Sequence, residues 1–260
     1  MDAESTVGAG GIYPDSVGGP PSSGLVFPSL YVIMDADLLP TAARNAGGVR
    51  LGRATPGERT GQEACPTELA IAAMLADSGV KLIQYRNKQA TPRNLFLISR
   101  ELAGFLSPRG VRFIVNDRPD VAALAGAGGV HVGQEDLGVE QARAICGKEA
   151  WVGISTHNLE QVAAAAKTSA GYIAVGPVFP TATKVRPEPV VGCDLVREAR
   201  QLTEKPIVAI GGITLENAES VFREGADSVA VARDILTAAN PGKRAGEFLD
   251  LAAKLGVGRS

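Results

Sequence analysis

Short apolar runs recur along the chain, and each is followed by polar residues and then by a segment of helical periodicity. The first run covers Leu30 to Met34. Seven later runs predict strands near 80–85, 111–115, 129–132, 150–154, 171–175, 206–210 and 227–231. Runs such as IVAI and YIAV are apolar at every position, which is typical of parallel strands covered on both faces. The pattern predicts an α/β protein in which helices connect parallel strands.

Residues suited to helix capping lie between these runs. Thr91 precedes a proline at the first helical position, and Asn158 is followed by Gln161 three residues later. Gly79 suits the left-handed conformation that ends a helix, and it follows the helical segment ELAIAAMLADSG. These signals place a helix before or after most of the predicted strands.

The alternation fits two architectures, a closed barrel and an open doubly wound sheet. An open sheet of the Rossmann type needs a G-x-G-x-x-G turn after an early strand, and the sequence has none. We therefore expect a single (β/α)8 TIM barrel over residues 28–260, a size at which such barrels form one domain. Residues 1–27 are rich in Gly, Ser and Pro and are expected to be a disordered tail. The stretch from about 38 to 64 is expected to be an inserted loop after the first strand.

Composition excludes several classes of protein. Lysines and arginines are dispersed and the net charge is -2, so no nucleic-acid surface is expected. No apolar run reaches the roughly 18 residues of a membrane span, and no signal peptide is evident. Cys65, Cys146 and Cys193 are odd in number and lack C-x-x-C spacing, which argues against a disulfide framework or zinc site. A cytoplasmic location fits these features.

Chemically equipped residues occupy one place in the repeat, directly after the strands. Because the C-terminal ends of barrel strands meet at one mouth, we expect these residues to gather there. They are Gln84, Arg86 and Lys88; Asn116 and Asp117; Gly133 to Asp136; Ser155; Thr181, Thr183 and Lys184; and Gly211 with Gly212.

Three of these residues predict an anion site. Gln84, Arg86 and Lys88 alternate along one strand end, so they point to the same side. Two cations and an amide on one side suit an anionic ligand, whereas surface salt bridges are the alternative interpretation. The glycine pair after the seventh strand allows backbone amides to approach a phosphate, although loops also use glycine freely.

Two carboxylates on neighbouring loops predict a metal site. Asp117 and Asp136 would repel each other unless a cation lay between them. Without a Cys or His cluster, hard oxygen ligands favour Mg²⁺, which takes one or two carboxylates together with waters and phosphate oxygens. In the alternative interpretation, each aspartate caps the helix that follows it.

The two histidines receive different interpretations. His157 follows Ser155, but no nucleophile elbow surrounds the serine, so a hydrolase is not expected. His157 is either a general acid or base or a residue that hydrogen-bonds its loop. His131 lies within a strand and is expected to be packed and satisfied.

The motifs QYRNK, VND, GVHVGQED, GISTHN, GPVFPTATK and IGGI, in this order and spacing, resemble thiamine-phosphate synthase, also called thiamine-phosphate pyrophosphorylase. The resemblance runs from about Leu30 to the end of the chain. It implies a (β/α)8 barrel that joins a hydroxymethylpyrimidine diphosphate to a thiazole phosphate, giving thiamine phosphate and pyrophosphate.

The resemblance also implies roles for individual residues, with Arg86, Lys88, Ser155 and Lys184 as the catalytic set. The pyrimidine diphosphate falls to Gln84, Tyr85, Arg86, Asn87, Lys88, Asn116, Ser155 and Lys184. Mg²⁺ falls to Asp117 and Asp136, and the thiazole phosphate to Thr181, Ala182, Thr183, Gly212, Ala232 and Arg233.

The sequence departs from the family pattern in three places. Asn87 stands where an acidic residue is common, so an ion pair supporting the basic residues is in doubt. Arg233 stands where a small residue is common, and it either adds a phosphate contact or turns outward. The loop at 38–64 is longer than usual.

Two rival functions stay open at this point. A thiazole tautomerase has the same barrel and uses a histidine at the position of His157, but it needs no diphosphate site. A non-catalytic phosphate-ligand binding protein is the second rival. Asp117, Asp136 and Lys184 favour metal-dependent coupling over both. A homo-oligomer is compatible with the sequence, and so is either a plain or a carboxylated thiazole phosphate.

Overall fold

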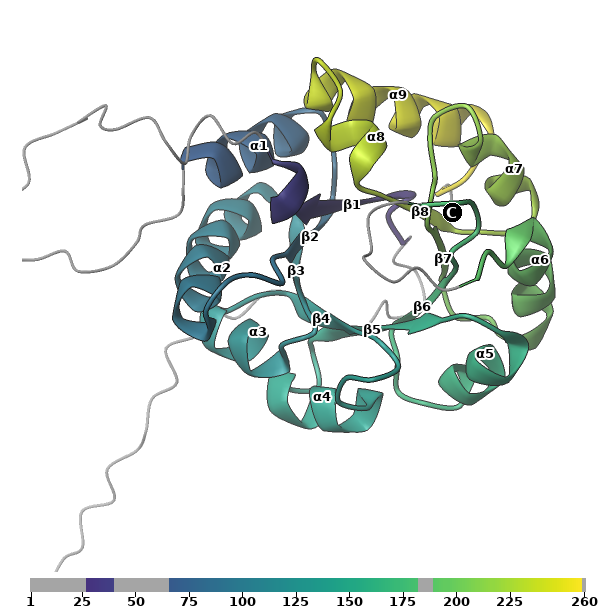
Figure 1. The fold of residues 1–260 in the computed structure, drawn as a ribbon, viewed down its shortest axis with the longest axis horizontal. Helices are drawn as coiled ribbons and strands as arrows, with labels where there is room; N and C mark the ends of the chain where they lie inside the picture. The colour runs from purple at the N-terminus through teal and green to yellow at the C-terminus, as the bar shows by residue number, and fades with distance from the viewer. Residues whose placement is uncertain (1–26, 40–65, 182–188, 259–260) are drawn as a thin grey trace, which may run out of the picture.

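The structure is a computed structural model, and it describes residues 27–39, 66–181 and 189–258. Within these ranges, eight parallel strands pair in chain order, and the eighth pairs with the first to close the barrel (Figure 1). The strands are β1 (Leu30–Asp35), β2 (Leu82–Arg86), β3 (Arg112–Asn116), β4 (Gly129–Val132), β5 (Trp151–Thr156), β6 (Tyr172–Val175), β7 (Ile207–Ile210) and β8 (Ser228–Val231). The expected (β/α)8 barrel is confirmed.

Helices form the outer ring of the barrel, as Figure 1 shows. The α-helices are α1 (Pro66–Asp77), α2 (Pro92–Leu106), α3 (Pro119–Ala125), α4 (Val139–Cys146), α5 (Leu159–Ala166), α6 (Gly192–Leu202), α7 (Ala218–Arg223), α8 (Arg233–Leu236) and α9 (Pro241–Lys254). Short 3-10 helices η1 (Ala36–Leu38) and η3 (Ser107–Arg109) follow β1 and α2.

Two predicted caps are present in the structure. The Thr91 hydroxyl accepts the Asn94 N–H at 3.3 Å at the start of α2. At the start of α5, Asn158 Oδ1 accepts the Gln161 N–H at 2.9 Å, while the Gln161 side chain accepts the His157 N–H at 2.7 Å. The Asn158 and Gln161 side chains therefore accept from backbone N–H groups at the start of α5 that have no partner within the helix.

Alternation along the strands divides the apolar side chains into two cores. One lies between the strands and the helices, and the other fills the barrel interior. Phe27 belongs to the interior core, where its ring stacks on Trp151 with centroids 5.1 Å apart. Phe27, which the expected tail of residues 1–27 included, is therefore packed inside the barrel. Residues 1–26 lie outside the described residues, as does most of the inserted loop.

In the described part of the chain, every helix is too short or too polar to cross a bilayer.

Candidate active site

A buried ion pair orients the arginine at the end of β2. Arg86 Nη1 donates to Asp35 Oδ2 at 2.5 Å, and the two residues are register partners on β1 and β2. Asp35 is 1% exposed, and its Oδ1 accepts the Asp37 N–H at 3.1 Å. Because the carboxylate is fixed by packing and by this second bond, it holds the guanidinium in one orientation.

A second ion pair joins the loop after β2 to the loop after β3. The Lys88 ammonium donates to Asp117 Oδ2. Asp117 has a φ of 61°, in the left-handed region that non-glycine residues rarely occupy, and its N–H donates to the His131 carbonyl at 2.8 Å. Strained backbone of this kind tends to occur at functional sites. The acidic partner expected near Asn87 is thus supplied by other residues, Asp35 and Asp117.

The loop after β4 brings a second carboxylate near Asp117. Asp136 Oδ2 accepts the Gly133 N–H at 2.7 Å. Burial raises the pKa of Asp136, and the negative charge of Asp117 raises it further, while the Gly133 bond and Lys88 oppose the rise. The two carboxylates therefore lie close enough to repel each other.

The alternative in which both aspartates are helix caps does not fit the structure. Helix α3 begins after Arg118 and α4 begins after Gly138, so the N-cap positions belong to other residues. Asp117 and Asp136 are directed instead to Lys88 and to the Gly133 amide.

These two carboxylates match the ligand chemistry of a hard cation. Among the described residues, no group of three or more His, Cys, Asp or Glu side chains converges. Mg²⁺ commonly uses one or two carboxylates and completes its octahedron with water and phosphate oxygens. A cation between Asp117 and Asp136 would also remove the repulsion that raises the pKa of Asp136. The pair thus fits Mg²⁺.

Below the mouth, two predicted site residues are the ends of one series of hydrogen bonds. Gln84 Nε2 donates to Tyr31 Oη at 2.6 Å, and Tyr31 Oη lies 2.9 Å from Tyr172 Oη. Tyr172 Oη lies 3.1 Å from His131 Nδ1, and His131 Nε2 lies 2.9 Å from Ser155 Oγ. All five side chains are buried. The expectation that His131 is packed and satisfied is confirmed, because each ring nitrogen has a partner.

Glycines shape the side of the mouth that follows β6 and β7. Gly211 and Gly212 have φ values of 95° and 65°. A Cβ on Gly212 would lie 2.4 Å from the Pro180 carbonyl oxygen, and one on Gly211 would lie 2.5 Å from Pro177 Cβ. The glycines are therefore required first by the close approach of the loop after β6, whether or not a phosphate also binds there.

The remaining thiazole-phosphate candidates are only partly described. Thr181 is half-buried after β6, whereas Ala182, Thr183 and Lys184 lie outside the described residues. After β8, Ala232 is half-buried and precedes α8, and Arg233 is exposed at its first position.

The side chains of two predicted substrate contacts, Tyr85 and Asn87, bond to other residues of the protein. Tyr85 is buried in the core between strands and helices, and its hydroxyl donates to Glu68 of α1 at 3.4 Å. Asn87 Nδ2 donates to Tyr85 Oη at 3.1 Å, while its Oδ1 accepts the Gln89 and Ala90 N–H groups. The Tyr85 side chain is therefore buried away from the mouth, and the Asn87 side chain bonds Tyr85 and the backbone of its own loop.

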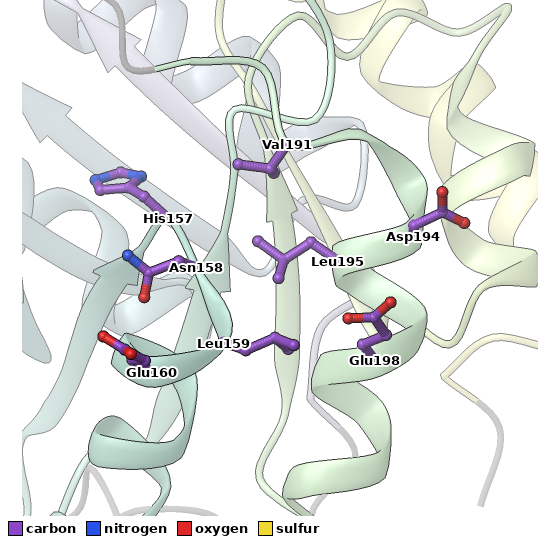
Figure 2. Close-up of a pocket in the computed structure, with 8 residues that line it drawn as sticks. All are labelled: His157, Asn158, Leu159, Glu160, Val191, Asp194, Leu195 and Glu198. Carbon is purple, nitrogen blue, oxygen red and sulfur yellow. The ribbon is translucent and has the colours of Figure 1, made fainter.

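His157 makes the loop contact that was one of its two interpretations. Its Nδ1 lies 2.5 Å from the Gly176 carbonyl oxygen, so Nδ1 carries the proton. Figure 2 shows His157 at the edge of an open groove between α5 and α6. The groove is lined by His157, Asn158, Leu159, Glu160, Val191, Asp194, Leu195 and Glu198. Asn116, another predicted contact, ends β3 and is half-buried.

Sequence reasoning missed three polar residues of this region, Asp35, Tyr31 and Tyr172. Asp35 obeys the same rule as the other candidates, because it directly follows the apolar run of β1. The tyrosines lie inside strands that are otherwise mostly aliphatic. A tyrosine hydroxyl at a strand position that faces the barrel interior was the sequence signal that could have identified them.

Comparisons with known proteins agree on one family. A family model for thiamine monophosphate synthase matches residues 60–235. Thiamine-phosphate synthase of Koribacter versatilis is 45% identical over 230 residues, covering 88% of this chain and 98% of that protein. Its counterpart in Methanospirillum hungatei is 38% identical, covering 71% of this chain and 90% of that one.

Solved structures give the same result. Thiamine phosphate pyrophosphorylase from Pyrococcus furiosus superimposes with a TM-score of 0.71 at 29% identity, covering 87% of this chain and 96% of that chain. A 3-hexulose-6-phosphate synthase matches with a TM-score of 0.58 at 18% identity over 86% of this chain and 99% of that one, which shows a shared fold only.

Proposed function

Because this chain belongs to the thiamine monophosphate synthase family, we propose that it couples a hydroxymethylpyrimidine diphosphate with a thiazole ethyl phosphate, giving thiamine phosphate and pyrophosphate. The observation that carries the proposal is the convergence of two cations and two carboxylates at one part of the mouth. These are Arg86, Lys88, Asp117 and Asp136. A diphosphate together with a divalent cation matches that mixture of charges.

The two substrates take different sides of the mouth in this proposal. The pyrimidine diphosphate contacts Gln84, Arg86 and Lys88, with Asn116 and Ser155 beside it. The thiazole phosphate lies against the glycine-rich loops after β6 and β7, where Gly212 lets the backbone approach. Holding the two rings face to face lowers the entropic cost of the bond-forming step.

The reaction breaks the bond between the pyrimidine methylene carbon and the diphosphate oxygen, and negative charge grows on the departing diphosphate. Arg86 is already oriented by Asp35, so its guanidinium needs little reorganisation to stabilise that charge. The thiazole nitrogen attacks the methylene carbon with its own lone pair. No strong base is required, so this reaction assigns no proton transfer to His157.

Mg²⁺ is the proposed cofactor, held by Asp117 and Asp136. When bound, it would neutralise part of the charge on the diphosphate as a Lewis acid. In the structure Lys88 supplies the positive charge beside Asp117. We propose that Lys88 leaves this carboxylate when the cation binds and then contacts a diphosphate oxygen.

The tautomerase alternative is less well supported. That reaction needs a titrating histidine but no diphosphate site. Here Arg86, Lys88, Asp117 and Asp136, on the β2 to β4 side of the described residues, provide a site for a diphosphate and a cation, which a tautomerisation would not use.

A direct test mixes purified protein with both heterocyclic phosphates and Mg²⁺ and quantifies thiamine phosphate and pyrophosphate. We expect the two products in equal amounts, and no turnover after chelation. Asp194→Asn is the matched control, because Asp194 pairs with Arg197 on the exposed surface of α6. Binding of both ligands without product would instead identify a non-catalytic binding protein.

A further inference from the structure

Five side chains form a continuous series of hydrogen bonds across the barrel interior, which we name the relay. It consists of Gln84 of β2, Tyr31 of β1, Tyr172 of β6, His131 of β4 and Ser155 of β5. Only the two ends belong to the proposed substrate contacts. The three middle residues lie between those ends and have no role in the reaction described above.

The number of hydrogens in the relay restricts how it can be arranged. Burial raises the pKa of Tyr31 and of Tyr172, so each phenol keeps its single proton at neutral pH. Each phenol can therefore donate only one hydrogen bond along the relay, and it must accept the other. A neutral imidazole at His131 likewise donates from one nitrogen and accepts at the other.

With a neutral His131 and the Gln84 amide oriented as in the structure, these limits give the relay one direction. Gln84 Nε2 donates to Tyr31, so Tyr31 donates to Tyr172 and Tyr172 donates to His131 Nδ1. His131 then carries its proton on Nε2 and donates to Ser155 Oγ. The Ser155 hydrogen is left for a ligand, and so is the Gln84 carbonyl oxygen. Reversing the direction requires all five groups to change together, after which Gln84 would offer a donor and Ser155 an acceptor.

A glycine makes the central link of the relay sterically feasible. A Cβ at Gly153 would lie 2.0 Å from Tyr172 Cζ and 2.4 Å from its Oη. The tyrosine ring therefore occupies the space that a side chain at Gly153 would fill, and it extends inward far enough to meet Tyr31. Tyr172 can therefore extend across the interior only because residue 153 is a glycine.

We propose that Tyr31, Tyr172 and His131 are positioning residues that couple Gln84 to Ser155, so that an acceptor at one end is always matched by a donor at the other. The proposal rests on the proposed function and names how that site selects its pyrimidine. A Gln84 carbonyl oxygen that faces the ligand accepts a hydrogen bond from an exocyclic amino group. An oxo group in the same place would instead put two acceptors, itself and the Gln84 oxygen, against each other. An oxopyrimidine would require all five groups to reverse together, so the relay in the direction shown favours an aminopyrimidine over the matching oxopyrimidine.

A double-mutant cycle tests the coupling. Gln84→Ala, Ser155→Ala and the double variant are compared for kcat/KM and for the Kd of the pyrimidine diphosphate. The cycle is repeated with Tyr172→Phe, which removes the central hydroxyl and keeps the ring. In the native background, we expect the double loss to fall short of the product of the single losses by about tenfold. In the Tyr172→Phe background, we expect the loss in the double variant to equal the product of the two single losses.

The preference for an amino over an oxo pyrimidine diphosphate gives a second readout, which a general loss of packing would not change. We expect this ratio to fall about tenfold in Tyr172→Phe. Tyr31→Phe breaks the relay at a different link and serves if Tyr172→Phe does not fold. Ser228→Ala is the control, because the Ser228 hydroxyl is buried and has no hydrogen-bond partner among the described residues.

The outcomes separate the relay from the proposed function. Losses that multiply in the native background overturn the relay, and so does coupling that persists in both tyrosine variants. If the native protein makes no thiamine phosphate, the proposed function fails. The binding cycle then decides the relay by the same criterion, with the pyrimidine diphosphate as the probe.

Discussion

The two sides of the barrel mouth, which lie opposite each other in Figure 1, are formed by different kinds of chemical group. On the side of β1 to β4, charged side chains form ion pairs, with Arg86 on Asp35 and Lys88 on Asp117. On the side of β6 to β8, the described residues bring backbone close to backbone through Gly211 and Gly212. The same strand-helix repeat thus supports charged groups on one side and close backbone approach on the other.

The difference follows from what each side is proposed to bind. A leaving diphosphate gains charge during the reaction, so fixed cations that oppose that charge act on the rate. A phosphate that only anchors its substrate keeps the same charge throughout, so backbone amides suffice, and they act mainly on binding. Substitutions on the charged side should therefore change kcat, and those on the glycine side should change KM and stability.

The largest expected effect is that of Asp117→Ala on the charged side. Loss of one carboxylate weakens the proposed Mg²⁺ site and releases Lys88, so we expect kcat/KM to fall about a hundredfold to a thousandfold. Alanine tolerates the positive φ of 61° less well than aspartate, so we expect a loss of about 1 kcal/mol of stability with the fold retained. Turnover at several Mg²⁺ concentrations and circular dichroism measure the two effects. Full activity of the variant in chelator would contradict the metal site.

Asp35→Asn should have the next largest effect. The substitution keeps the shape of a side chain that is 1% exposed but leaves Arg86 without its counter-charge. Breaking a buried pair costs about 3 kcal/mol, and we expect kcat to fall about tenfold to a hundredfold because the guanidinium loses its orientation. Urea unfolding and steady-state kinetics measure both.

Asp120→Asn is the matched control for this pair. Asp120 bonds Arg118 on the exposed surface at the start of α3, where an ion pair contributes about 1 kcal/mol or less. Equal losses of stability in the two variants would show that the burial of Asp35 has no energetic consequence.

Gly212→Ala tests the glycine side against a glycine of nearly identical backbone. Gly212 and Gly110 have φ values of 65° and 67°, but a Cβ at Gly110 would meet no described atom within 4 Å. Both alanines pay the left-handed strain of about 1 kcal/mol, so a further loss at Gly212 isolates the contact with the loop after β6. We expect KM for the thiazole phosphate to rise about tenfold while kcat changes less than threefold. A change confined to kcat would remove the distinction between the two sides.

The strands could be predicted from local apolar periodicity, whereas the closed barrel was preferred to an open sheet because the sequence lacks a G-x-G-x-x-G turn. The convergence of Arg86, Lys88, Asp117 and Asp136 followed from strand order alone, since loops after neighbouring strands share one mouth. Strand alternation also places Tyr85 opposite to its neighbours, so its outward side chain was predictable, although motif resemblance included it.

Pairings that depend on register were not predictable. Arg86 meets Asp35 because their strands align at those residues, and the sequence does not state that alignment. Likewise Tyr172 meets Tyr31 only because Gly153, on another strand, leaves space for its ring. Each of these contacts joins residues that are distant in the chain, and local patterns carry no information about them.

The smallest expected effect comes from Asp136→Asn and concerns stability on the charged side. Burial and the charge of Asp117 raise the pKa of Asp136 in the folded protein, so the folded state binds its proton more tightly than the unfolded state. Stability from this group is complete below the ordinary aspartate pKa of about 4, and it is lost as the pH rises through the raised value. At neutral pH the native carboxylate is therefore mildly destabilising. Solvent screens this half-buried group, so we expect the asparagine variant to melt only about 1–2 °C higher at pH 7 without divalent cations.

The amide oxygen of the new asparagine can still accept the Gly133 N–H, so the turn after β4 should be retained. The gain should vanish near pH 3, where both proteins are neutral at this position, and thermal melts at the two pH values measure it. Mg²⁺ should stabilise the native protein and not the variant, since binding to the folded state raises the melting temperature. A variant that melts lower at neutral pH would show that Asp136 is not repelled by Asp117. The charged side would then lack the repulsion that a bound cation relieves, and its contrast with the glycine side would rest on the ion pairs of Arg86 and Lys88.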